Sequence, residues 1–318
     1  MGQTAHGSQR CRSWCRPIRR AAMIKASAPG SIMITGEHAV VYGHKAIVAA
    51  IEQRVFVTLT PRDDQRVVIR SEIADPLEIA LADIAIEGPY RFVLAAVLQH
   101  RAQLPSGFAL DIRSEINPTL GLGSSAAVTI ACLGAIARYA GAALEDLHAR
   151  AHKIILDIQG RGSGADLAAS LTGGMISYDN TGEISPLPLP PQLGLKYCGY
   201  KTPTAVVLQR VAEDSKGRED EIATLYQDMG ESAQHAIDAA LTQDWQRFGA
   251  ELTRYQGFME TLGVSDDVLD QIIADARTTA QATKISGSGL GDCVLSLGTL
   301  PQGFTAARVA EQGLIIDG

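Results

Sequence analysis

The sequence predicts an α+β fold with two domains, and three observations lead to this expectation. Strand and helix patterns are mixed along the chain, without the steady βαβ alternation of a doubly wound sheet. A stretch at residues 185–194 with four prolines separates two such mixed regions. The length of 318 residues, with 46% apolar and 20% charged residues, suits two modest folded domains. We therefore expect domains at residues 24–190 and 191–318.

The elements are predicted from the spacing of apolar residues. Alternating or β-branched runs predict strands, and apolar residues three and four apart predict helices. In the first domain, strands are expected at 54–60, 67–71 and 108–116, and helices at 90–103, 124–139 and 144–159. In the second domain, strands are expected at 205–208 and 293–297, and helices at 219–241, 244–262 and 266–282.

Composition excludes several classes of function. The formal net charge of −7 argues against a nucleic-acid-binding surface. No run of about 18 apolar residues appears, so no membrane span is expected. Five scattered cysteines do not form a disulfide framework, and they favour a reducing compartment, the cytoplasm.

The first 23 residues differ from the rest of the chain. They hold five arginines and no acidic residue, a composition that resembles a transit peptide. The segment lacks a helical apolar face, so the favoured interpretation is a disordered or non-native leader before a natural start at Met23. We exclude residues 1–23 from the fold.

The strongest chemical signal is the glycine-rich segment at residues 117–127, Asn-Pro-Thr-Leu-Gly-Leu-Gly-Ser-Ser-Ala-Ala. It lies between a predicted strand and a predicted helix. Glycines let the backbone N–H groups approach a ligand, and the helix start adds free N–H groups and the positive end of the helix dipole. This arrangement predicts a polyphosphate site. The structural alternative is that Ser124 or Ser125 is an ordinary helix N-cap.

Three further glycine-rich segments strengthen the signal. Residues 27–43 contain Glu37 and His38, for which a buried structural histidine is the alternative. Residues 284–292 read Lys-Ile-Ser-Gly-Ser-Gly-Leu-Gly-Asp, for which a simple β-turn is the alternative. Residues 160–174 place Asp166 among small residues. A carboxylate there can orient a reacting hydroxyl and accept its proton, or it can simply cap a helix.

Other phosphate-binding patterns fit less well. Gly121-x-Gly123-x-x-Ala126 matches a relaxed dinucleotide fingerprint, but the preceding strand alternates instead of being continuously apolar. A dinucleotide oxidoreductase is therefore remote. The P-loop pattern and the protein-kinase motif set are both absent from the sequence.

Taken together, these segments resemble the GHMP kinase superfamily, from about residue 25 to the end of the chain. Gly-Glu-His-Ala-Val-Val-Tyr-Gly within residues 27–43 is most similar to the mevalonate kinase branch. The resemblance implies a nucleotide-binding N-terminal domain, a ferredoxin-like C-terminal domain and an active site between them. It also implies phosphoryl transfer from ATP, with Mg²⁺ (magnesium), to the primary hydroxyl of a small hydroxy acid. For the mevalonate branch this acceptor is mevalonate, giving 5-phosphomevalonate for isoprenoid precursors.

The resemblance assigns roles to individual residues. Asp166 matches the catalytic aspartate, and Ser125 is the magnesium contact. The ATP-binding residues implied are Pro118, Gly121, Leu122, Gly123, Ser124, Ser125 and Ala126. The substrate-side residues implied are Glu37, His38, Gly287, Ser288 and Lys201.

The sequence departs from the mevalonate kinase pattern at two positions. Ser31 stands where that branch has a lysine that favours an ionised catalytic aspartate. Ile155 stands where it has a magnesium-binding glutamate, so Asp157, or Ser125 with water, is left as the ligand. Lys201 is a candidate replacement cation, or else a solvated lysine.

Alternatives to a mevalonate kinase stay open. Residues 151–166 and Gly291-Asp292-Cys293 resemble phosphomevalonate kinases, for which Lys201 or Arg161 would bind the additional phosphate. A non-catalytic ATP-binding regulator is a third interpretation. The sequence is compatible with a homodimer but does not determine the oligomeric state.

Overall fold

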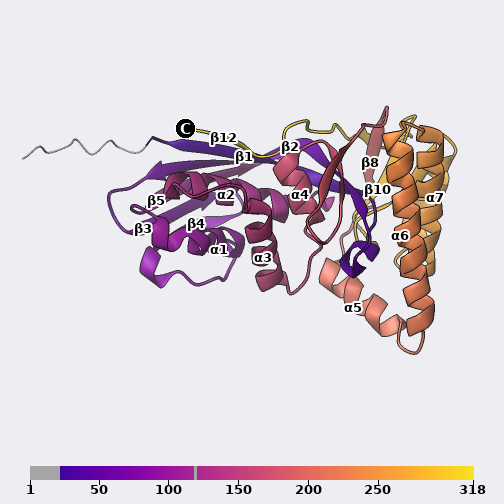
Figure 1. Cartoon of the computed structure of the whole chain (residues 1–318), viewed down its shortest axis with the longest axis horizontal. Helices are drawn as coiled ribbons and strands as arrows, with labels where there is room; N and C mark the ends of the chain where they lie inside the picture. Colours follow the sequence, from indigo (N-terminus) through magenta and orange to yellow (C-terminus); the bar gives the residue numbers. More distant parts are fainter. Residues whose placement is uncertain (1–21, 118–119) are drawn as a thin grey trace, which may run out of the picture.

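The computed structural model describes residues 22–117 and 120–318, and it contains two β-sheets with helices packed on them (Figure 1). Pro118 and most of the expected leader at residues 1–23 lie outside the described residues. No helix in the described part is long and apolar enough to cross a membrane.

The larger sheet belongs mainly to the N-terminal half. Its strands follow the order β12-β1-β2-β5-β3-β4. Outside this order, β6 pairs with β2 on one side and with β7 on the other. Neighbouring strands are antiparallel except β3 and β5, which run parallel. The strands are β1 (Ile24–Thr35), β2 (Ala46–Pro61), β3 (Arg66–Ser71), β4 (Ala74–Ala80), β5 (Phe108–Ser114), β6 (Met175–Tyr178), β7 (Ile184–Leu187) and β12 (Ile315–Asp317).

Helices cover this sheet and enclose the main core. Helix α2 packs against β1 and β2 and is apolar nearly all round, which is typical of a helix buried in the interior. Helix α4 packs beside it on β1. The helices are α1 (Arg91–His100), α2 (Ser124–Ala140), α3 (Leu147–Gln159) and α4 (Ala165–Thr172), with short 3₁₀ turns η1 (Ala39–Tyr42), η2 (Leu81–Asp83) and η3 (Arg101–Gln103).

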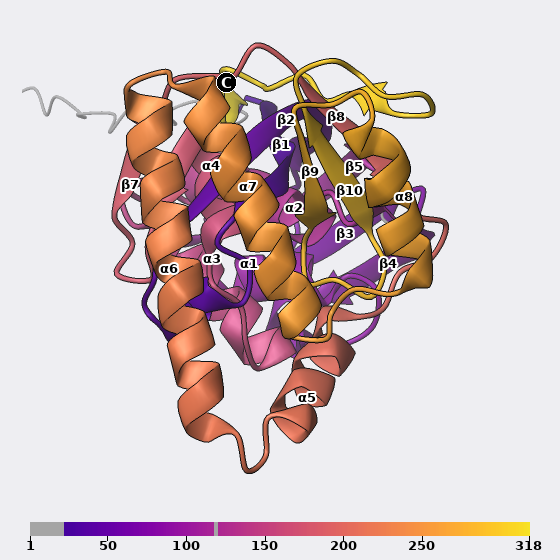
Figure 2. The same ribbon diagram turned by 90° about the vertical axis from the view of Figure 1, so that its right-hand side faces the viewer.

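The smaller sheet follows the proline-rich stretch. Its order is β11-β8-β10-β9 and all its pairs are antiparallel. Helices α7 and α8 pack on β9, and α6 packs on α7, so a helical layer lies over this sheet (Figure 2). The elements are α5 (Thr204–Asp214), α6 (Glu219–Leu241), α7 (Trp245–Thr261), α8 (Asp267–Arg277), β8 (Leu193–Tyr197), β9 (Ala282–Ser286), β10 (Cys293–Leu297) and β11 (Thr305–Ala306).

The structure confirms most predicted elements and the α+β class. The predicted strand at 205–208 is wrong, because this segment is the first part of helix α5. Its buried residues are Val207 and Val211, four residues apart, which is the spacing of a helix face. The end of the chain returns to the larger sheet, since Ile316 of β12 pairs with Ala26 of β1.

A buried ion pair joins the two halves of the molecule. Glu37, just after β1, has its Oε1 2.5 Å from Nζ of Lys284 on β9, and both side chains are almost completely buried. The hydroxyl of Tyr255 on α7 donates to the Glu37 carbonyl at 2.6 Å, and the Lys284 ammonium lies over the Tyr255 ring. Two residues further along β9, the Ser286 hydroxyl donates to the Met33 carbonyl at 2.8 Å. These contacts fix β1 against β9 at the junction of the two sheets.

We predict strong coupling between the two members of this pair. Lys284→Met leaves a buried carboxylate without its partner and is expected to lower the free energy of unfolding by about 3–5 kcal/mol. The double variant Glu37→Gln/Lys284→Met removes both charges and should lose clearly less than the sum of the single variants. Urea unfolding of the four proteins measures the coupling, and additive losses would contradict it.

Candidate active site

The glycine-rich loop before α2 lies against two other segments of the chain. The Ser31 amide donates to the Leu122 carbonyl at 3.2 Å, which ties the loop to β1. Gly121 and Gly123 both have positive φ, +69° and +65°. A Cβ at Gly123 would lie 2.0 Å from the Ser31 hydroxyl oxygen, and one at Gly121 would lie 2.6 Å from Asp292 Oδ1. Only glycine therefore permits both the backbone conformation and this close approach.

The loop leads directly into α2. Gly123 is the N-cap residue, and it has no side chain that could cap the helix. The alternative that Ser124 or Ser125 is the N-cap is therefore wrong. A helix start without a side-chain cap leaves backbone N–H groups for a ligand, and the helix dipole favours an anion at the same place.

Asp166 lies in the first turn of α4, after a turn held by side chains from other elements. His148 Nε2 lies 3.0 Å from the Gly164 carbonyl, and His152 Nε2 lies 2.8 Å from the Gly162 carbonyl. The hydroxyl of Tyr178 donates to the Ser163 carbonyl at 2.7 Å. These contacts come from α3 and β6, so the packed domain fixes the turn that carries the aspartate.

Ile155 has a packing role in this arrangement. It is buried on α3, and a Cβ at Gly162 would lie 2.8 Å from its Cγ2. The apolar side chain therefore supports the turn before Asp166. Asp157 lies in an exposed ion pair with Lys153, at 3.0 Å.

Asp166 is connected to β1 by a direct hydrogen bond. The Ser31 hydroxyl donates to Asp166 Oδ1 at 2.7 Å. Burial raises the pKa of the Asp166 carboxyl above its ordinary value, and the negative charge of Glu37 acts in the same direction. The Ser31 hydrogen bond and the positive charge of Lys201 counteract this increase in pKa. Since Ser31 also touches Gly123, one side chain contacts both the loop and the aspartate.

His38 joins the glycine-rich segment at residues 27–43 (the first segment) to the one at residues 284–292 (the third segment). Its Nε2 lies 2.9 Å from the Ser288 carbonyl, so this nitrogen carries the proton. Burial lowers the pKa of His38, which favours the neutral ring. Its Nδ1 and Glu37 Oε2 are then buried acceptors without a hydrogen-bond partner among the described residues. Both atoms can accept a hydrogen bond from a ligand hydroxyl.

Lys201 lies on the loop between β8 and α5 and reaches the third segment. Its Nζ is 3.6 Å from Asp292 Oδ1, and its side chain is 36% exposed. Burial raises the pKa of Asp292, and the charge of Lys201 counteracts that increase. The third segment itself lies next to Gly121 through Asp292.

The structure thus brings together several residues that the sequence singled out. Ser31 links Gly123 to Asp166, His38 contacts Ser288, and Lys201 pairs with Asp292. Gly287 also lies here, and its amide donates to Glu37 Oε1 at 3.4 Å. Arg161 is exposed on the turn before α4.

Sequence reasoning missed two residues of this region. In the sequence Lys284 stands out only as the first residue of a glycine-rich turn, because Thr283 and Ser286 in the same strand hide the burial of that strand. Asp292 was read as a branch marker, yet its carboxylate lies between Gly121 and Lys201. Both were visible in the sequence, but their partners are distant in the chain.

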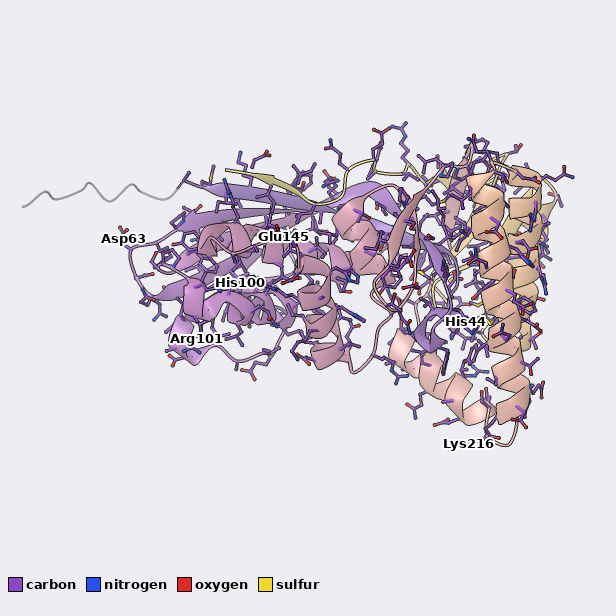
Figure 3. The ribbon with its side chains drawn as sticks, viewed as in Figure 1. His44, Asp63, His100, Arg101, Glu145 and Lys216 are labelled. Carbon is purple, nitrogen blue, oxygen red and sulfur yellow. The ribbon has the colours of Figure 1, made fainter. Side chains whose placement is uncertain are left out.

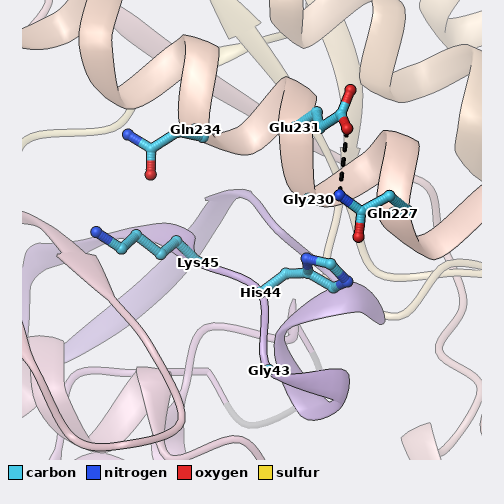
Figure 4. A pocket seen from close by; sticks show the side chains of 7 residues that line it. All are labelled: Gly43, His44, Lys45, Gln227, Gly230, Glu231 and Gln234. Atoms are coloured by element: carbon cyan, nitrogen blue, oxygen red, sulfur yellow. Dashed lines mark hydrogen bonds between the residues drawn. The ribbon is translucent and has the colours of Figure 1, made fainter.

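A separate hollow of about 250 Å³ lies beside η1 and α6. Its lining does not include Asp166 or the loop before α2, and it is polar (Figure 4). His44 lies against α6 in this region, where a Cβ at Gly230 would be 2.0 Å from its Nδ1 (Figure 3). The lining residues are Gly43, His44, Lys45, Gln227, Gly230, Glu231 and Gln234.

Comparisons with known proteins identify the family of this chain. The family model described as GHMP kinases N terminal domain matches residues 90–174, and GHMP kinases C terminal matches residues 236–312. The mevalonate kinase of Pyrococcus furiosus is 32% identical over 312 residues, which cover 90% of this chain and 92% of that protein.

Solved structures share the fold. A crystal structure of mevalonate kinase has a TM-score of 0.74 and 22% identity, covering 91% of this chain and 99% of that one. Streptococcus pneumoniae phosphomevalonate kinase, in complex with phosphomevalonate and AMPPNP, has a TM-score of 0.73 and 17% identity. The match covers 88% of this chain and 93% of that one. Together with the sequence relatives, these matches show that the chain belongs to the GHMP kinases and is an ATP-dependent, mevalonate kinase-like kinase of small molecules.

Proposed function

We propose that the protein transfers the γ-phosphoryl group of ATP to the primary hydroxyl of mevalonate, giving 5-phosphomevalonate. The proposal rests chiefly on the contacts of Ser31, which bonds to the Asp166 carboxylate and packs against Gly123 of the glycine-rich loop. Identity above 30% to a curated mevalonate kinase over most of both chains supports this acceptor. A cytoplasmic location fits this proposal.

The roles of the residues follow from what phosphoryl transfer needs. Such transfer depends on alignment and on positive charge around the transferring group, with little covalent help from the protein. The ATP phosphates would be held by the backbone N–H groups of the loop and of the first turn of α2. These residues are Gly121, Leu122, Gly123, Ser124, Ser125 and Ala126. Asp166 would orient the acceptor hydroxyl and accept its proton as the new P–O bond forms.

The acceptor would lie between the first and third glycine-rich segments. His38 Nδ1 and Glu37 Oε2 are buried acceptor atoms without a partner in the described chain, and they suit hydroxyl groups of a hydroxy acid. Gly287 and Ser288 would close the site from the opposite side. The proposal therefore keeps these four residues on the substrate side, with Lys201 nearby.

Magnesium fits this site as an ion held mainly by the nucleotide. Among the described residues no group of three or more histidine, cysteine, aspartate or glutamate side chains is placed to hold a metal. Mg²⁺ commonly keeps several waters and binds through substrate phosphates and a few protein oxygens. Ser125, in the first turn of α2, is the proposed protein contact, and the ion would neutralise phosphate charge.

A second acceptor, phosphomevalonate, is favoured by one observation. Lys201 is a partly exposed cation at the site and could bind an additional phosphate. The two acceptors differ by one phosphate group, so a direct comparison of turnover separates them.

We predict that mevalonate is the preferred acceptor in a panel with phosphomevalonate, galactose and homoserine, all assayed with ATP and magnesium. Product identification by mass spectrometry should show 5-phosphomevalonate. Preferred turnover of another acceptor would reject the assignment while leaving the kinase activity intact.

We predict that Asp166→Asn lowers kcat by about 10²–10⁴-fold, because the amide cannot accept the hydroxyl proton. ATP binding, measured by calorimetry, should stay within about threefold of wild type, since the loop binds the nucleotide. Asp157→Asn on the exposed face of α3 is the matched control and should retain full turnover. Equal turnover of the Asp166 variant and wild type would show that this carboxylate has no catalytic role.

We predict that kcat falls at acidic pH as the Asp166 carboxyl becomes protonated, which gives the pH profile an acidic limb. The carboxyl must be ionised to accept a proton, and its pKa is raised by burial, so activity should fall below a pH higher than the ordinary carboxyl range. Ser31→Ala removes a hydrogen bond that lowers this pKa, so the limb should move to higher pH. Ser27→Ala, on the same strand but bonded to Arg54, should leave the limb in place. A limb that does not move in the Ser31 variant argues against Asp166 as its source.

A further inference from the structure

The candidate site has an unusual balance of charge. Two carboxylates, Asp166 and Asp292, lie beside the glycine-rich loop through Ser31 and Gly121. A bound triphosphate would add further negative charge at the same place. The hydrogen-bond partner of Asp166 on β1 is the neutral Ser31, so β1 supplies no positive charge here.

Buried Lys284 does not supply this positive charge. Its side chain is 0% exposed, and its ammonium is bound to Glu37 and to the Ile285 carbonyl. An ammonium that is fully enclosed and paired cannot reach a phosphate over the loop. Among the described residues, Lys201 is the cation whose charge acts on both Asp166 and Asp292, and its Nζ lies 3.6 Å from Asp292 Oδ1.

The residues on both sides of Lys201 are hydrogen-bonded to the third glycine-rich segment. The Asp292 amide donates to the Tyr200 carbonyl at 3.0 Å, and the Thr202 hydroxyl donates to the Leu290 carbonyl at 2.5 Å. The Tyr200 hydroxyl is held in turn by Asp266 at 2.6 Å. These bonds fix the loop that carries Lys201 against the third glycine-rich segment.

Asp292 links Lys201 to the glycine-rich loop before α2, because it lies close to both Lys201 and Gly121. The ammonium lies 3.6 Å from Asp292 Oδ1, beyond hydrogen-bond distance, and this buried oxygen has no hydrogen-bond partner in the described chain. The same oxygen would lie 2.6 Å from a Cβ at Gly121. Asp292 thus holds the ammonium at the loop by charge, while the side chain remains 36% exposed and open to a ligand.

We propose that Lys201 is a catalytic residue of this kinase, and that its ammonium contacts the phosphoryl group in transfer. This inference rests on the proposed phosphoryl transfer and is independent of which acceptor is used. In the step, the bond between phosphorus and the oxygen bridging to ADP breaks as a bond from phosphorus to the acceptor oxygen forms. The hydroxyl proton passes to the Asp166 carboxylate, and Lys201 keeps its proton throughout.

The physical reason is the charge that develops on the phosphoryl oxygens and on the departing ADP. A preorganised cation in a partly buried site stabilises this charge more than water does, and removing one such group commonly costs about 10²–10³-fold in kcat. Asp292 has a positioning role, because its carboxylate attracts the ammonium to the loop and does not itself contact the phosphate.

The test compares Lys201→Met, Lys201→Arg and the control Lys196→Met. Lys196 is on β8, five positions earlier in the chain, and is a lysine outside the site. We expect kcat of Lys201→Met to fall by about 100-fold or more with the acceptor that wild type turns over. The kcat of Lys201→Arg should be at least tenfold higher than that of Lys201→Met. The kcat of Lys196→Met should match wild type.

A second measurement uses no acceptor, so it stands even if mevalonate is not the substrate. Calorimetric titration with ATPγS and with ADP gives the preference for the nucleotide that carries a γ-phosphoryl group. Lys201→Met should reduce this preference about tenfold, whereas Lys196→Met should leave it unchanged. A kcat of Lys201→Met within threefold of wild type, or an unchanged nucleotide preference, would overturn the inference.

Discussion

The candidate site depends on one constraint, the close approach of the glycine-rich loop to β1 and to the turn before β10. The contacts at Gly121 and Gly123 leave no room for a Cβ, and Ser31 and Asp292 fill the space where a side chain would be. This packing brings three distant segments of the chain to one place. Without it, the start of α2, the aspartate of α4 and the third glycine-rich turn would have no fixed relation.

The two halves of the molecule meet at the same place because charged and polar groups are paired across the junction. Glu37 and Lys284 are both enclosed, and such a pair is retained only when each charge has its partner. Tyr255 and Ser286 add hydrogen bonds to the backbone of the first half. The junction therefore fixes the orientation of the segments around the candidate site, whose residues come from both halves.

The charges around Asp166 suit the proposed phosphoryl transfer even though its neighbour on β1 is a serine. Ser31 gives Asp166 a hydrogen bond but no charge, and Lys201 contributes positive charge from the opposite half of the molecule. Burial keeps the pKa of Asp166 high, so a nearby cation matters for its ionisation. In the proposed mechanism, the two roles that one lysine could fill are divided between the Ser31 hydroxyl and the Lys201 ammonium, which lie on different elements.

The sequence by itself determined the α+β class, most of the helices and the glycine-rich segments, because these follow from local apolar spacing and from residue types with special backbone freedom. It misjudged residues 205–208, where β-branched residues hid a helical spacing, and it left Ser31 only as a missing lysine. The tertiary structure decided which side chains meet: Ser31 with Asp166, Glu37 with Lys284, and Lys201 with Asp292. These pairs are separated by long stretches of chain, and their distances arise from the packing of two sheets and their helices, which no local pattern encodes.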